Sequence, residues 1–183
     1  MPSRAVRAAL LLAPLLAAPP ATLSAQGDIR LGLGAGITVP VRSYGDVVDK
    51  GWMGNASLTF FPAASAALGF RLDGLYGRSN LSAISGHQTQ VGGTANLVLQ
   101  FGARRSPNRF YLFGGGGYVK TTTSSPNFGR LTDTNPAFNA GTGFSFGVRS
   151  IALFVEGRYL NVYTDGVKPQ YAPLLAGVTF GGF

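Results

Sequence analysis

Alternation of apolar residues with small or polar ones runs through most of this chain, and it limits the fold more than any other feature. From residue 29 to 39, one parity holds Ile29, Leu31 and Leu33, and the other holds Arg30 and Gly32. Successive side chains of a β-strand point to opposite faces, so a period of two is typical of a strand with two different surroundings. Helical spacing is hard to find after residue 26. We therefore predict an all-β protein.

Eight such segments, each of about ten residues, follow one another along the chain. They cover 29–39, 52–61, 68–76, 90–101, 109–120, 138–148, 153–159 and 174–180. Their connections alternate between long (41–51, 78–88, 121–135, 163–171) and short (62–65, 102–108, 149–150). This indicates an eight-stranded antiparallel up-and-down barrel, with both termini at the short-turn rim. The segment 109–120 is apolar on both faces, and the sequence does not say which face points inward.

The two faces of these segments differ in a way that favours a membrane. A soluble barrel of the lipocalin kind would load its polar face with Lys and Glu, whereas only 12% of this chain is charged and the polar face is mainly Gly, Thr, Ser, Asn and Gln. Small residues suit the narrow lumen of eight strands. Aromatic residues near the segment ends are expected to form interfacial belts: Trp52, Tyr76, Phe101, Phe110, Tyr111, Tyr118, Tyr159, Tyr163 and Tyr171. We predict that the apolar face meets lipid; a soluble ligand-binding barrel is the alternative.

The first 25 residues have the organisation of a secretory signal peptide. Arg4 and Arg7 precede an apolar run over 8–18, and Ala25 offers a small residue at a cleavage point before Gln26. The run is too short for a membrane-spanning helix, although a retained anchor is the alternative. The predicted organisation is a signal peptide over 1–25 and one barrel domain over 26–183.

The motifs "RFYLFGGGGY", "VEGRY" and "PLLAGVTFGGF", with the eight segments and the signal peptide, resemble the small outer-membrane β-barrel superfamily of the OmpA-barrel and OmpX type. The resemblance covers residues 27–183. It implies a Gram-negative outer membrane, contact with its lipids and lipopolysaccharide, and a monomer. It also implies insertion by periplasmic chaperones and the barrel-assembly machinery, which would read Gly177, Phe180 and Phe183 in the last strand.

Five charged residues fall on the polar face at membrane depth: Arg30, Arg71, Asp73, Glu156 and Arg158. Charges at this depth are costly unless they are paired or hydrated. We predict that they form ion pairs filling the lumen, with neighbouring Asn and Gln side chains as hydrogen-bond partners. A gate or a narrow path for small solutes or ions is the alternative function.

Signals for catalysis or cofactors are weak. His87 lies near Ser82 and Ser85, so a lipid acyltransferase or hydrolase is an alternative, but no acid is adjacent in sequence and we expect no enzyme. The absence of Cys and the single His give no basis for a metal site, and the glycines 114–117 lack the helix and Lys of a phosphate loop, so no cofactor is expected. The net charge is +8, but the Lys and Arg residues are scattered along the chain and form no basic run, so nucleic-acid binding is not favoured. The sequence therefore predicts a structural or surface-interaction barrel.

Overall fold

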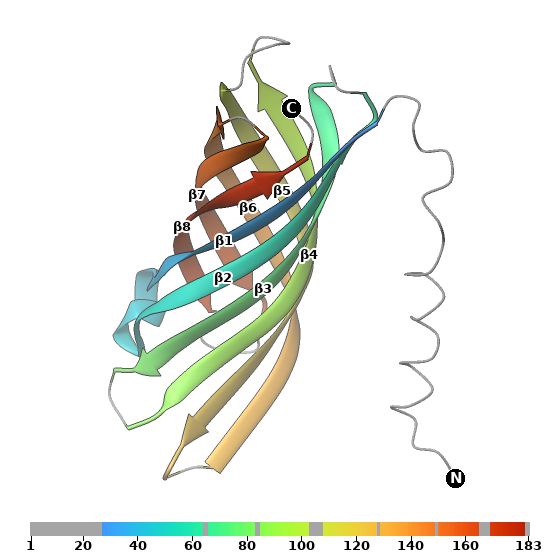
Figure 1. The fold of residues 1–183 in the computed structure, drawn as a ribbon. Coiled ribbons are helices and arrows are strands. Elements are labelled where there is room, and N and C mark those ends of the chain that lie inside the picture. The colour runs from blue at the N-terminus through green and yellow to red at the C-terminus, as the bar shows by residue number, and fades with distance from the viewer. Residues whose placement is uncertain are drawn as a thin grey trace, which may run out of the picture.

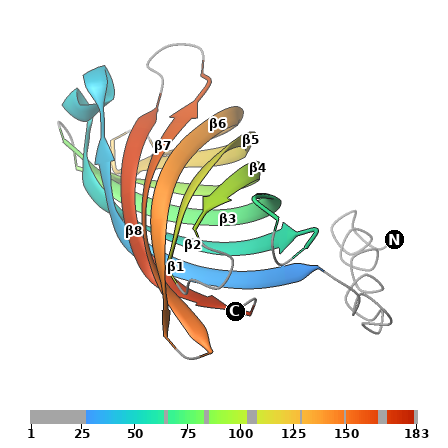
Figure 2. The ribbon, with the colours of Figure 1, turned by 90° about the horizontal axis from the view of Figure 1, so that it is seen from above.

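A computed structural model describes residues 27–63, 66–82, 85–102, 108–127, 129–148, 150–164 and 169–181. Its strands are β1 (Asp28–Pro40), β2 (Val48–Phe61), β3 (Leu68–Leu81), β4 (His87–Phe101), β5 (Asn108–Ser125), β6 (Gly129–Val148), β7 (Ile151–Val162) and β8 (Gln170–Phe180). Each pairs antiparallel with the next, and β8 pairs with β1 (Figures 1 and 2). The predicted eight-stranded barrel is confirmed. The predicted signal peptide and Phe183 lie outside the described residues.

The barrel closes along a seam between its first and last strands. The register runs from Leu31 opposite Phe180 to Pro40 opposite Tyr171, with Gly34 opposite Gly177. Phe180 ends β8 with its side chain on the exterior. Gly181 then takes a φ of 85°, which lies in the left-handed region that favours glycine, and the chain leaves the sheet there.

The exterior of the barrel is apolar and its interior holds small, polar and charged side chains together with some large apolar ones. Leu33 on β1, Leu72 on β3 and Leu97 on β4 are all about half exposed, although they are large and apolar. Asn96 and Asn139 are buried inside. A soluble barrel with an apolar lumen is therefore the wrong alternative. On β5, the strand that the sequence left unassigned, Phe110, Leu112 and Tyr118 face outward, whereas Tyr111, Phe113 and Val119 face inward.

The two ends of the barrel differ, but less simply than the sequence predicts. We call the end with both termini the terminal end; it carries the connections 62–67, 102–107 and 149–150. The opposite, distal end carries 41–47, 82–86, 126–128 and 163–169. The expected long loop at 121–135 is wrong, because β5 and β6 continue through it and turn within 126–128. Strict alternation of long and short connections is therefore not observed.

The continued part of β5 and β6 forms a hairpin that reaches beyond the rest of the barrel (Figure 1). The two strands stay paired up to Ser125 opposite Gly129, whereas β7 joins β6 only from Ala137 opposite Val162. Among the described residues, positions 129–135 of β6 therefore have a strand partner on one side only, whereas the carbonyl oxygen of Pro136 accepts a hydrogen bond from the backbone N–H of Tyr163. We call this element, residues 120–135, the distal hairpin.

Candidate functional site

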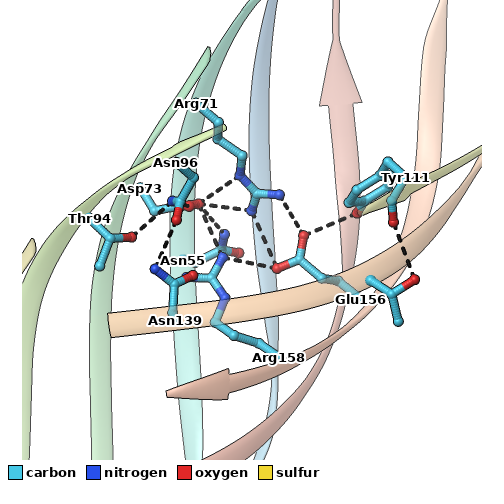
Figure 3. Close-up of polar contacts among 10 residues, drawn as sticks. Asn55, Arg71, Asp73, Thr94, Asn96, Tyr111, Asn139, Glu156 and Arg158 are labelled. Atoms are coloured by element: carbon cyan, nitrogen blue, oxygen red, sulfur yellow. Dashed lines mark hydrogen bonds and ion pairs between the residues drawn. The ribbon is translucent and has the colours of Figure 1, made fainter. Parts of the chain in front are cut away.

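Four charged side chains from two opposite strands meet in the middle of the barrel (Figure 3). Arg71 and Asp73 come from β3, and Glu156 and Arg158 come from β7. Arg71 contacts Glu156 at 2.6 Å and Asp73 at 2.8 Å. Arg158 contacts Glu156 at 2.9 Å and Asp73 at 3.3 Å. Each arginine thus bridges both acids, and the four formal charges cancel; we call these residues the central network.

Neutral side chains complete the central network. Asn96 donates to Asp73 at 2.7 Å and accepts a hydrogen bond from Asn139 at 2.8 Å. Tyr111 donates to Glu156 at 3.1 Å. The guanidinium carbons of Arg71 and Arg158 each lie 4.9 Å from the centre of the Phe113 ring. A buried charge is tolerated only with such partners, because transfer out of water is expensive.

Arg30, the fifth charge predicted for this cluster, lies elsewhere. It sits near the terminal end on β1, where its Nε donates to Asp28 at 2.8 Å and its Nη1 donates to Gln100 at 3.0 Å. Asp28 is absent from the predicted set of lumen charges. The signal was present, since Asp28 and Arg30 are two residues apart and therefore share a strand face.

The distal end is closed by part of the connection 41–51, which the sequence predicts to be a loop. The 3-10 helix η1 (Arg42–Asp46), between β1 and β2, turns Tyr44 into the barrel. The Tyr44 ring packs edge-on against Tyr171 at 5.1 Å, and the two hydroxyl oxygens are 2.8 Å apart. Gln88 accepts a hydrogen bond from Tyr44, and Gln90 donates one to Tyr171. We call these four residues the distal plug.

Among the described residues, no helix has the length and apolar character needed to cross a membrane.

Two of the aromatic residues expected in the interfacial belts are instead inside the barrel. Tyr171 is 0% exposed because its hydroxyl belongs to the distal plug, and Tyr111 turns inward to reach Glu156. The other expected aromatics are on the outside: Trp52, Tyr76, Phe101, Phe110, Tyr118 and Tyr163 are exposed and Tyr159 is half-buried. The two corrections have one cause, since a Tyr hydroxyl can complete a buried polar network as well as face an interface.

Large apolar side chains also occupy the interior, where the alternating pattern predicts small and polar ones. A distal cluster contains Met53, Leu75 and Leu160, and a terminal cluster contains Phe61, Val98 and Phe113. They interrupt the small-polar face of their strands. Segments in which even- and odd-numbered positions are both apolar, such as 109–120, indicate that apolar side chains also face the interior.

The residues considered for catalysis are not assembled into a site. His87 begins β4 opposite Asn80 and Ser124, and among the described residues it makes no hydrogen bond or ion pair with a serine or a carboxylate. The part of the chain that the structure describes also holds no group of three or more His, Cys, Asp or Glu suited to a metal ion.

The sequence matches a family model over almost its whole length. The model describes the outer membrane protein beta-barrel domain and matches residues 8–180. The chain belongs to this family. Membership agrees with the closed barrel and its apolar exterior, and it places the protein in the bacterial outer membrane. A comparison with curated proteins gave no match.

Solved outer-membrane barrels share the fold at low sequence identity. Neisserial surface protein A is 19% identical, with a TM-score of 0.66 over 83% of this chain and 96% of that one. A major outer membrane protein from Thermus thermophilus is 12% identical, with a TM-score of 0.63 over 85% and 99%. The attachment invasion locus protein Ail of Yersinia pestis is 17% identical, with a TM-score of 0.51 over 85% and 98%. At these identities the similarity shows the fold alone.

Proposed function

We propose that this outer-membrane barrel is a closed structural protein that presents its distal hairpin at the cell surface, without a channel or an enzymatic activity. The observation that carries the proposal is the filled interior. The central network crosses the lumen between β3 and β7, and the distal plug covers it on the hairpin side. A path for solutes would have to break both layers.

The energetics of the central network argue against a channel. Opening it would separate Arg71 and Arg158 from two carboxylates in a narrow space, and such buried charges are very costly without partners. Eight strands also leave an interior only wide enough for side chains. The narrow-channel alternative is therefore disfavoured.

The distal hairpin is the surface feature that this barrel offers for contact. Its side chains are mainly polar, including Thr132 and Thr134, and the β6 edge at 129–135 has no second strand partner in the part of the chain that the structure describes. Arg130 and Asp133 are exposed on it. Unpaired strand edges can bind an extended segment of another chain, so we place the contact role here.

The exterior supports an orientation with the distal end outward. Arg78 and Lys120 are exposed on the outside of β3 and β5, next to the aromatics Trp52, Tyr76 and Tyr118. Aromatic rings favour the interface and cations favour lipid phosphates, so this rim suits a leaflet that contains lipopolysaccharide. The terminal end then lies in the periplasm, where chaperones and the barrel-assembly machinery would have received the chain.

Planar bilayer recordings of the folded protein test the closed interior. We expect no discrete conductance steps. The double variant E156A/R158A, which empties part of the central network, is the comparison and is expected to produce small steps. Regular steps from the unaltered protein would overturn the closed-barrel proposal.

Surface labelling tests the orientation. An epitope inserted between Pro126 and Asn127 in the distal hairpin is expected to bind antibody on intact cells. The same epitope inserted after Pro62, at the terminal end, is the matched control and is expected to bind only after permeabilisation. The reverse pattern would show that the distal hairpin faces the periplasm and would exclude the surface role.

A further inference from the structure

The terminal end of the lumen contains a cavity that the proposed function does not use. Its volume is about 60 Å³, and its lining includes the cations Arg30, Arg71 and Arg109, the neutral Gln100 and Tyr111, and the carboxylate Glu156, which Arg71 and Arg158 neutralise. A cavity needs roughly 10–15 Å³ to admit each water, so the space suits about four to six waters or one tetrahedral oxyanion. It lies on the far side of the central network from the distal plug.

Two arginines at this cavity converge on one neutral oxygen. Arg30 Nη1 donates to Gln100 Oε1 at 3.0 Å, and Arg109 Nη1 donates to the same atom at 3.2 Å. The Arg30 side chain is 12% exposed, and Arg109 is half-buried. Like charges held this close repel each other, and a shared amide oxygen does not neutralise either of them.

Arg109 differs from the other charged side chains inside the described barrel. Asp28 pairs with Arg30, Arg71 with Asp73, and Glu156 with Arg158, each two residues apart on one strand. Arg109 forms no ion pair with a described carboxylate. The central network is neutral, so Arg30, Arg109 and Asp28 leave the cavity with one excess positive charge.

We propose that this cavity is a binding site for a small oxyanion with phosphate or sulfate chemistry, held between Arg109 and Arg30. The fork of N–H groups on a guanidinium matches the oxygens of such anions. Gln100 orients both arginines through its Oε1 while its Nε2 donates to the carbonyl oxygen of Ala66 at 2.8 Å. The neighbouring Tyr111 hydroxyl faces the same space from the central network.

Isothermal titration of the folded protein in a phospholipid-free, non-ionic detergent tests the site. Sodium sulfate and sodium phosphate are expected to bind saturably at one site per chain, and sodium chloride at equal ionic strength is expected to give no such binding. Arg109→Gln is expected to weaken binding by about tenfold or more, because a charged hydrogen-bond partner is lost. Lys50→Gln, which removes an exposed cation from β2 at the distal end, is the control and should leave binding unchanged.

Two results would overturn the proposal: no saturable binding of either oxyanion by the unaltered protein, or unchanged binding by Arg109→Gln. The first requires no variant, so it stands even if a substitution prevents folding. Folding of each variant is checked by its gel migration before and after heating, and Arg109→Lys, which keeps the charge and loses the fork, should bind with intermediate affinity.

A second titration identifies the source of the anion. Dihexanoyl phosphatidic acid, a soluble lipid with a phosphate headgroup, is compared with inorganic phosphate. Tighter binding of the lipid supports an oxyanion site for a headgroup, whereas tighter binding of inorganic phosphate supports one for a free ion. Binding of neither ligand would count against the site.

Discussion

Glu156 receives more of the interior polar contacts than its neighbours on β7. It accepts hydrogen bonds from Arg71, Arg158 and Tyr111, and its side chain is fully buried. Glu156 stabilises the fold by neutralising two buried guanidinium groups. The attraction within such a buried ion pair largely offsets the free-energy cost of removing its charges from water. The effect of removing this one charge should therefore be large.

Glu156→Gln keeps the size of the side chain but leaves Arg71 and Arg158 with only Asp73. We expect the free energy of unfolding to fall by about 3–5 kcal/mol, the range found when one partner of a buried pair is removed. Urea unfolding in phospholipid vesicles measures it. Asp133→Asn, on the exposed distal hairpin, is the control and should change stability by less than about 0.5 kcal/mol. A loss below about 1 kcal/mol in Glu156→Gln would contradict the charge-balance argument.

Alkaline pH is expected to weaken the docking of the distal plug, through ionisation of Tyr44. Burial raises the pKa of the Tyr44 phenol, and the hydrogen bonds with Tyr171 and Gln88 oppose this only in part. Because the folded state favours the neutral phenol, its stabilising contribution is complete below about pH 10 and is lost as the pH rises further. The difference in 295 nm absorbance between the unaltered protein and Tyr44→Phe should titrate above pH 10. A midpoint at or below pH 10 would show that Tyr44 is not buried in the plug.

At the scale of strands, the seam between β1 and β8 decides whether the barrel closes. Gly177 lies opposite Gly34, and a Cβ at Gly177 would overlap the carbonyl oxygen of Leu33 and come within 2.7 Å of the Phe154 ring. The seam therefore uses glycine for close approach of backbone and ring. This gives Gly177 a packing role, whether or not it is also read during insertion.

Gly177→Val should prevent most molecules from closing, because its Cβ would overlap the Leu33 backbone, which is fixed by its pairing with Val178 in the seam. The fraction that migrates as the compact form before boiling is the measurement. Gly157→Ala on β7 is the matched control, since nothing lies within 4 Å of a Cβ there. An equal compact fraction in Gly177→Val and the unaltered protein would contradict the steric argument.

The alternating pattern predicts the strand pairing, and it predicts which side chains point outward wherever every second residue is clearly apolar, as with Leu31 and Leu33 of β1. The pattern failed at two kinds of position. Phe113 and Tyr111 face inward because the lumen has its own apolar and tyrosine layers, which local composition does not distinguish from a lipid face. Tyr44 reaches the interior from a connection, through contacts with residues on β4 and β8 that are distant in sequence. Such contacts depend on the closed barrel and leave no local signature.

For the whole molecule, the apolar exterior sets where the barrel is stable. The outward side chains of β3 between Leu68 and Arg78 are mainly apolar, and this stretch of a tilted strand spans about 25 Å. That height matches the apolar band of outer-membrane barrels. This apolar surface is therefore suited to contact with lipid and not with water.

Leu72→Arg places a charge in the middle of that exterior, where Leu72 is 60% exposed. We expect the free energy of folding into phospholipid vesicles to become less favourable by about 2–4 kcal/mol, the cost of an arginine at the bilayer midplane. Thr134→Arg, on the distal hairpin, should change it by less than about 0.5 kcal/mol. Similar values for both variants would mean that β3 does not cross the bilayer at this depth.

The spacing of the buried charges has a consequence for how the barrel enters its membrane. Asp28 and Arg30, Arg71 and Asp73, and Glu156 and Arg158 each sit two residues apart on one strand. On each of these strands, the buried charge therefore has a counter-ion on the same face before the strand meets its final neighbours. These three strands can then enter the lipid without a lone lumen charge, and the cross-barrel contacts between β3 and β7 form when the cylinder closes.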